Sequence, residues 1–205
     1  MIRLVLAPHG DDEVLGCGGV LAKYPAESTV FIVSHRGDSR HDETGSAAKI
    51  LGYKGIIYGD FHTGQLYSEM RKLITTFDRL INDARPDVLY VPFPSMHQDH
   101  MAVYEAGLRS ARLGFSGRRH YVPTVLVYDV SAYTSNLYET GLKWNHYEAL
   151  TEEQIDLKVK AFSEYESQQD GNVDSSALKD EARVLGHQHG VPFAERYAVV
   201  RQVAR

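Results

Sequence analysis

A histidine and three acidic residues follow the first apolar run of the chain. Residues 4–7 are apolar and lead directly into residues 8–13, which read Pro-His-Gly-Asp-Asp-Glu. Burying ionisable side chains costs several kcal/mol unless they are paired or bind a cation. We therefore expect the ionisable groups of this turn to line an exposed rim, to cap a helix or to hold a metal ion.

A second group of the same kind follows another apolar run. Residues 97–100 read His-Gln-Asp-His and come shortly after the apolar run 88–93. In an open parallel sheet, ligands bind outside the carboxyl ends of the strands. Since both groups follow strand-like segments, we predict that they converge on one site.

Short apolar runs alternate with longer amphipathic segments over much of the chain. Continuous apolar strands separated by helices indicate right-handed βαβ units. We predict an α/β fold in which a mostly parallel sheet is flanked by helices and the active site lies at the carboxyl ends of the strands. The predicted strands are 3–7, 29–33, 55–58, 88–91 and 124–128, and the predicted helices are 14–23, 45–51, 67–84 and 101–112.

The pattern changes after the last of these strands. Residues 129–147 are rich in Tyr, Thr, Ser and Asn without a clear period, and we expect them to cover the active face. Residues 151–154 resemble a capping box that opens a helix running towards Gln168. The remaining predicted elements are a helix over 175–185 and a strand at the sheet edge over 195–203.

Length and composition narrow the class of protein. The 205 residues suit one domain, 1–205, in which 129–205 completes the fold and covers part of the pocket. A net charge of −5 with scattered Lys and Arg gives no electrostatic footprint for nucleic acid. No apolar stretch reaches the roughly 18–20 residues needed to span a membrane, and no signal-peptide cleavage site follows the start, so we expect a cytoplasmic location. The oligomeric state stays open, a homo-oligomer included.

The residues that remain for metal binding are histidines and carboxylates. Cys17 is the single cysteine, which excludes a zinc site built from several thiolates, and we expect it to be a buried structural thiol. Catalytic zinc sites keep three protein ligands and leave positions for water and substrate, a requirement that His9, Asp12 and His100 meet. A zinc ion there would lower the pKa of a water molecule towards neutrality and polarise a carbonyl oxygen.

Three neighbouring residues could supply the proton transfers. Asp11 could accept the proton of the water as general base. His97 could stabilise an oxyanion as imidazolium or donate a proton to a leaving nitrogen, with Asp99 orienting its ring or raising its pKa. This set of groups suits the hydrolysis of an amide.

Residues 8–13 and 97–100 resemble the paired motifs of the PIG-L/LmbE-like de-N-acetylase family. Its first motif usually reads His-Pro-Asp-Asp-Glu, whereas this chain has Gly10 at the proline, which should loosen the turn. Two further segments are similar to family motifs: residues 40–52, with an Arg-x-x-Glu pattern and a helix ending in Leu-Gly, and the Ser-Gln helix around 165–168.

The resemblance implies a Rossmann-like fold and a zinc-dependent enzyme that removes acetyl groups from N-acetylglucosamine conjugates, with a small-molecule amino sugar or glycoconjugate as partner. It implies that His9, Asp12 and His100 hold the zinc, and Fe²⁺ could occupy the same ligands. By the same resemblance Asp11 is the base and His97 the electrophilic partner.

Other interpretations of the candidate residues stay open. The acidic residues 11–13 could merely favour a helix N-terminus, a role that explains Glu13 without metal contact. Arg40, Phe61 and His62 follow strand ends and are candidate substrate-binding residues, although exposed arginines are commonly just solvated.

Two functions of other classes also fit parts of the sequence. A sugar-binding protein could keep the metal pocket without turnover, although a pure binder needs neither a base at Asp11 nor an acid at His97. A nucleotide-binding Rossmann domain has only the glycine cluster at 16–19 in its favour, and this cluster lacks the phosphate-binding spacing.

Overall fold

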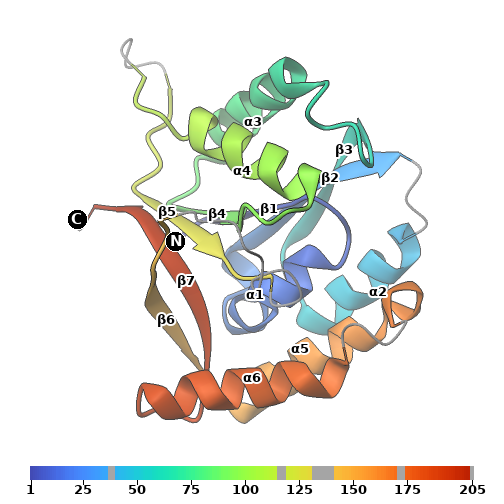
Figure 1. The fold of residues 1–205 in the computed structure, drawn as a ribbon, viewed down its shortest axis with the longest axis vertical. Coiled ribbons are helices and arrows are strands. Elements are labelled where there is room, and N and C mark those ends of the chain that lie inside the picture. Colours follow the sequence, from blue (N-terminus) through green and yellow to red (C-terminus); the bar gives the residue numbers. More distant parts are fainter. Residues whose placement is uncertain (37–39, 115–118, 131–140, 170–173, 204–205) are drawn as a thin grey trace.

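The described residues, 1–36, 40–114, 119–130, 141–169 and 174–203, form one sheet with helices on both faces in this computed structural model (Figure 1). The strands are β1 (Arg3–Ala7), β2 (Ser28–Arg36), β3 (Gly55–His62), β4 (Val88–Pro92), β5 (Thr124–Tyr128), β6 (Trp144–Leu150) and β7 (Phe193–Gln202). The helices are α1 (Asp12–Lys23), α2 (His41–Leu51), α3 (Met70–Ala84), α4 (Gln98–Ser110), α5 (Glu152–Ser163) and α6 (Ser175–Gln188), with short 3-10 turns η1 (Pro25–Glu27) and η3 (Glu166–Gln168).

The strand order is β3-β2-β1-β4-β5-β7-β6. Strands β1 to β5 pair in parallel, and β7 runs antiparallel to both β5 and β6. The chain builds outward from β1 to β3, then crosses back to place β4 on the other side of β1. This reversal between β1 and β4 is the topological switch point at which α/β sheets bind ligands. The predicted α/β class with a mostly parallel sheet is confirmed.

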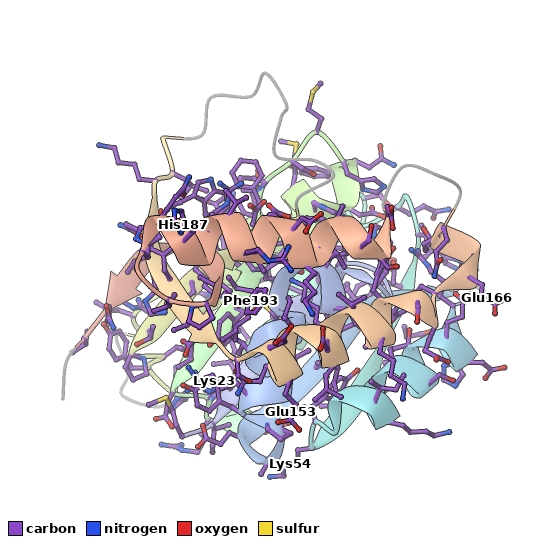
Figure 2. All side chains as sticks on the ribbon, turned by 90° about the horizontal axis from the view of Figure 1, so that it is seen from below. Lys23, Lys54, Glu153, Glu166, His187 and Phe193 are labelled. Atoms are coloured by element: carbon purple, nitrogen blue, oxygen red, sulfur yellow. The ribbon has the colours of Figure 1, made fainter. Side chains whose placement is uncertain are left out.

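Each face of the sheet has its own apolar core, because successive strand residues point to opposite faces. In β1, Val5 and Ala7 belong to the core under α1, α2 and α5, whereas Leu4 and Leu6 belong to the core under α3 and α4. Figure 2 shows α5 and α6 side by side across the first of these faces. The sheet is thus covered on both sides.

The helices that lead out of the site begin earlier than their apolar periodicity predicts. Helix α1 begins at Asp12 instead of residue 14, α2 at His41 instead of 45, and α4 at Gln98 instead of 101. Their first turns are polar, so a search for an apolar stripe passes over them. As a consequence, Asp12, Asp99 and His100 lie on rigid first turns of helices rather than in loops.

The C-terminal part differs more from expectation. Strand β6 (Trp144–Leu150) begins within the segment 129–147, in which the sequence shows no clear period, and it lies at the sheet edge. The last strand, β7, is therefore not at the edge as predicted but lies between β5 and β6. Helix α5 ends at Ser163 instead of running towards Gln168, although its capping box at Thr151 is present. Residues 131–140 of the segment expected to cover the active face lie outside the described residues.

The structure also bears on the single cysteine and on membrane-spanning helices. Cys17 is buried in the core beneath α1, as expected of a structural thiol. Within the part of the chain that the structure describes, no helix has the length and apolar character required to traverse a membrane.

Candidate active site

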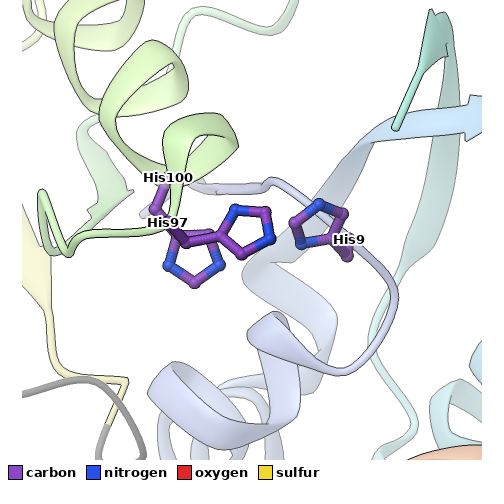
Figure 3. Close-up of side chains that lie close together, drawn as sticks. All are labelled: His9, His97 and His100. Carbon is purple, nitrogen blue, oxygen red and sulfur yellow. The ribbon is translucent and has the colours of Figure 1, made fainter. Parts of the chain in front are cut away.

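Two turns at the carboxyl ends of β1 and β4 carry the candidate residues. Because β1 and β4 are paired neighbours, the turn before α1 and the turn before α4 meet. Figure 3 shows the rings of His9, His97 and His100 close together, the first from the α1 side and the other two from the start of α4. One nitrogen of each ring lies within 4.8 Å of those of the other two. The predicted convergence of the two motifs therefore holds in the structure.

Asp12 connects two of these histidines. Its Oδ2 lies 3.2 Å from Nδ1 of His9, and its Oδ1 lies 3.3 Å from Nε2 of His100. The backbone N–H of His9 also donates to Asp12 Oδ2, at 3.0 Å. All three side chains are buried. Asp12 thus brings the three residues that the motifs single out as ligands into one contact group.

The Asp99 carboxylate is hydrogen-bonded to His9, while its charge acts to raise the pKa of His97, one of the two roles expected for it. Its Oδ2 lies 3.0 Å from Nε2 of His9 and accepts a hydrogen bond from the Gly64 N–H at 2.7 Å. Nδ1 of His97 accepts a hydrogen bond from the backbone N–H of Asp99 at 3.2 Å. The reason is the helical first turn of α4, in which the Asp99 side chain points towards the β1 turn. Asp99 therefore orients His9.

Asp11 has a strained backbone beside this group. Its φ angle is 112°, in a region that residues other than glycine rarely adopt. Its N–H donates to Glu13 Oε2 at 3.0 Å, and its carboxylate accepts a hydrogen bond from Arg40 Nη1 at 3.1 Å. Glu13 is itself fully buried and accepts a hydrogen bond from the hydroxyl of Tyr165. Glu13 thus supports the turn, in line with the role expected for it.

The electrostatics of the site favour a positive charge between the carboxylates. Burial lowers the pKa of His9, but its contacts with Asp12 and Asp99 outweigh burial and raise it to about 9. Burial raises the pKa of Asp12, but His100 and His9 outweigh it and hold that pKa well below its usual range. A group that stabilises a protonated imidazole this strongly also suits a bound cation, and its N and O donors fit Zn²⁺ or Fe²⁺.

The pKa of Asp11 is raised, unlike that of Asp12, and the pKa of His97 is lowered, unlike that of His9. Burial and the neighbouring charge of Asp12 raise the pKa of Asp11 well above its usual value, despite Arg40. Burial, followed by the nearby His9 and His100, lowers the pKa of His97. Because Nδ1 of His97 accepts the Asp99 N–H, the neutral ring carries its proton on Nε2. This favours a neutral hydrogen-bond donor over the imidazolium expected from the motif.

The three predicted substrate-binding residues lie in different surroundings. Phe61 is buried in the core beneath α3 with Lys72 over its ring, so it does not line the site, because strand alternation turns it towards the helix. His62 is exposed at the end of β3. Arg40, predicted to contact substrate, pairs with Asp11.

Gly10 has a steric role that the motif comparison does not reveal. A Cβ atom at this position would collide with Oγ1 of Thr44 in α2 and lie 3.5 Å from Cβ of Arg40. The positive φ angle in this turn belongs to Asp11 and not to Gly10. The glycine therefore allows α2 to lie close to the turn, while the expected loosening of the turn stays a prediction.

Three residues of the site are absent from the sequence-based candidates. Ser95 is buried, with its Oγ 3.2 Å from His100 Nδ1, and Gly64 and Tyr165 contact Asp99 and Glu13 through long-range hydrogen bonds. Ser95 and Tyr165 have a sequence signal, since Ser95 lies two residues before the second motif and Tyr165 begins the family-like segment 165–168, whereas Gly64 has none.

Two sequence comparisons relate the chain to deacetylases. Residues 4–111 match the profile of the family described as PIG-L, GlcNAc-PI de-N-acetylase. The chain is 28% identical over 181 residues to the uncharacterized deacetylase YaiS of Escherichia coli K12, with 80% of this chain and 90% of that protein covered.

Two solved structures show how widely the fold is used. N,N'-diacetylchitobiose deacetylase from Pyrococcus horikoshii has a TM-score of 0.75 at 20% identity, covering 97% of this chain and 83% of that one. GalB, the 4-carboxy-2-hydroxymuconate hydratase of Pseudomonas putida KT2440, has a TM-score of 0.81 at 16% identity, covering 100% and 98%. At these identities the likeness shows the fold alone, so the chemistry must be argued from the site.

Proposed function

Because this chain belongs to the PIG-L family of de-N-acetylases, we propose that it is a metal-dependent hydrolase that removes the acetyl group of an N-acetylated amino sugar. The observation that carries the proposal is the contact of the buried Asp12 carboxylate with one nitrogen of His9 and one of His100, directly beside a second carboxylate, Asp11. A metal site and a proton acceptor at adjacent positions are what amide hydrolysis requires.

We assign His9, Asp12 and His100 as the residues that would hold the metal. Zn²⁺ suits two imidazoles and one carboxylate, and Fe²⁺ accepts the same donors. When bound, the metal would polarise the amide carbonyl and lower the pKa of a water molecule towards neutrality. The nitrogens of His9, His97 and His100 form the group that lies within 4.8 Å, so His97 is the alternative ligand to Asp12. We assign Asp12 because Nδ1 of His97 accepts the Asp99 N–H, which leaves the proton of the neutral ring on Nε2.

The remaining residues divide the proton transfers between them. Asp11 takes the proton of the attacking water, because burial and Asp12 make it a stronger base than an ordinary carboxylate. His97 donates from Nε2 to the carbonyl oxygen as negative charge develops there. The C–N bond then breaks as the proton held by Asp11 passes to the leaving nitrogen, which yields acetate and a free amino sugar.

The substrate class is inferred from the family and from one structure of the same fold. The family description and the chitobiose deacetylase of the same fold both concern N-acetylglucosamine units, so we infer an N-acetylglucosamine-type conjugate. His62, exposed at the end of β3, stays our candidate for a contact with a sugar hydroxyl.

Acetate release tests the proposal directly. The purified protein would be assayed with N-acetylglucosamine, N,N'-diacetylchitobiose and a glycolipid conjugate, after chelation and after addition of Zn²⁺ or Fe²⁺. We expect metal-dependent acetate release that Asp11→Ala lowers by about 10²–10⁴-fold with the metal retained, because a general base contributes that much. His100→Ala should instead weaken metal retention. Metal and sugar binding without acetate release from any substrate would favour the alternative, a non-catalytic sugar-binding protein.

A further inference from the structure

We propose that Arg40 is a positioning residue that holds the carboxylate of Asp11 in place, rather than a residue that binds substrate. The inference rests on the proposed function, in which Asp11 is the base. Nη1 of Arg40 lies 3.1 Å from Oδ2 of Asp11, and the two side chains are only 14% and 11% exposed. An ion pair this shielded from water is stronger than a surface pair.

Asp11 needs a partner for its carboxylate because the residue lies on a strained turn. Its φ angle is 112°, and its carboxylate accepts a hydrogen bond from Nη1 of Arg40. Glu13 holds the backbone N–H of Asp11 in its strained conformation, but the carboxylate itself is bonded to Arg40. The backbone and the functional group of the base are therefore held by different residues.

The sequence brings Arg40 to this position through Gly10 and Thr44. Arg40 immediately precedes α2, and its carbonyl accepts hydrogen bonds from both the N–H and the Oγ1 hydroxyl of Thr44, each at 2.8 Å. The first turn of α2 rests against Gly10, where any Cβ would collide with Thr44 Oγ1. The missing side chain at residue 10 is thus what allows Arg40 to reach Asp11.

A comparison of kcat with KM separates positioning from substrate binding. We expect Arg40→Gln to lower kcat by about 10–100-fold, the range seen when a residue supporting a metal site is removed, with KM and bound metal unchanged. Arg40→Lys should recover part of kcat. The matched control is Lys49→Gln, which removes a positive charge from an exposed position of α2 and should leave kcat and KM unchanged.

Two kinetic outcomes would overturn the proposal: a raised KM with kcat retained, which indicates substrate binding, or wild-type kinetics in Arg40→Gln. A crystal structure of Arg40→Gln gives a readout that does not depend on activity, and an Asp11 carboxylate in its original place would also contradict the proposal. A wild-type protein that releases no acetate would instead count against the proposed function, so the two failures are distinguishable.

Chemical rescue and a paired substitution complete the test. Guanidinium chloride should restore kcat to Arg40→Ala, whereas sodium chloride at equal ionic strength should not. Gly10→Ala should reproduce the kcat loss while the protein stays folded in a thermal melt, and Thr44→Ala in the same chain should recover it by removing the collision. Failure of both rescues would contradict the proposed contact chain.

Discussion

Nε2 of His9 and Oδ2 of Asp99 lie 3.0 Å apart although 90 positions separate them in the chain. This contact joins the turn after β1 to the first turn of α4. It exists because the crossover from β3 places β4 beside β1. The site is therefore a product of sheet topology, with each half supplied by a local motif.

We predict that Asp99 supports metal binding by orienting His9. Asp99→Asn should weaken zinc affinity by about 10–100-fold, because partners of metal-ligating histidines fix the ring and raise its basicity. A competition titration with a zinc-binding dye measures this. Asp83→Asn, at an exposed position of α3, is the matched control, and equal affinities in the two variants would refute the prediction.

The hydroxyl of Tyr165 is predicted to stabilise the turn before α1. It donates to the buried carboxylate of Glu13, and both side chains are fully buried. Tyr165→Phe leaves a buried acceptor without this donor and should lower the free energy of unfolding by about 1–3 kcal/mol. Urea denaturation tests it against Tyr121→Phe, a half-buried phenol outside this network. An equal loss in both variants would contradict this role.

Lys158 is predicted to be required for stability because it compensates the buried charge of Glu195. Nζ of Lys158 lies 2.7 Å from Glu195 Oε1 and donates to the Leu15 carbonyl at 2.7 Å, with both charged side chains buried. Lys158→Met should cost about 3–5 kcal/mol, since it leaves a buried carboxylate without its cation.

The control for this ion pair is on the same helix. Lys160→Met replaces an exposed lysine two residues further along α5 and should change the free energy of unfolding by no more than about 0.5 kcal/mol. If Lys158→Met and Lys160→Met lowered the free energy of unfolding equally in denaturant titrations, the prediction for Lys158 would be wrong.

Glu148 is predicted to make stability depend on acid pH. Burial raises its pKa, but hydrogen bonds with His146 and Lys23 and the charge of Lys23 outweigh it and lower the pKa from 4.5 to about 2. A carboxyl with a depressed folded-state pKa stabilises the protein above its unfolded pKa. The contribution of Glu148 is therefore full above pH 4.5 and lost as the pH falls towards about 2.

Urea unfolding as a function of pH measures this contribution. Relative to wild type, Glu148→Gln should lose roughly 1–2 kcal/mol near neutral pH after allowance for solvent screening, and the gap should close in acid. Glu153→Gln, an exposed glutamate labelled in Figure 2, should show no such gap. A gap that persists at low pH would show that packing, not charge, explains the loss.

The parallel strands and the convergence of the motifs could be predicted from the sequence, because buried strands are continuous apolar runs and ligands gather at their carboxyl ends. Strand β6 could not be predicted in this way. Leu150 is its single buried residue, and an edge strand this polar has no clear hydrophobic period. The helix starts at Asp12 and Gln98 were not predicted either, because the first turns of α1 and α4 are polar and have no apolar period.

Within the site, motif positions were predictable and contact partners were not. His9, Asp12 and His100 meet as expected, whereas the pairing of Asp99 with His9 depends on the direction of a helical side chain. The hydrogen bond from Tyr165 to Glu13 spans 152 positions, and no local pattern indicates it. Sequence motifs specify which groups are present, while topology decides which of them touch.

The most direct test of the metal centre is an anomalous difference map from crystals of the protein loaded with zinc, recorded at the zinc absorption edge. We predict a single strong peak bonded to His9, Asp12 and His100, with Asp11 and His97 beside it but not bonded. A map in which the zinc is bonded to His97 in place of Asp12, or in which no peak lies between the two turns, would contradict the assignment.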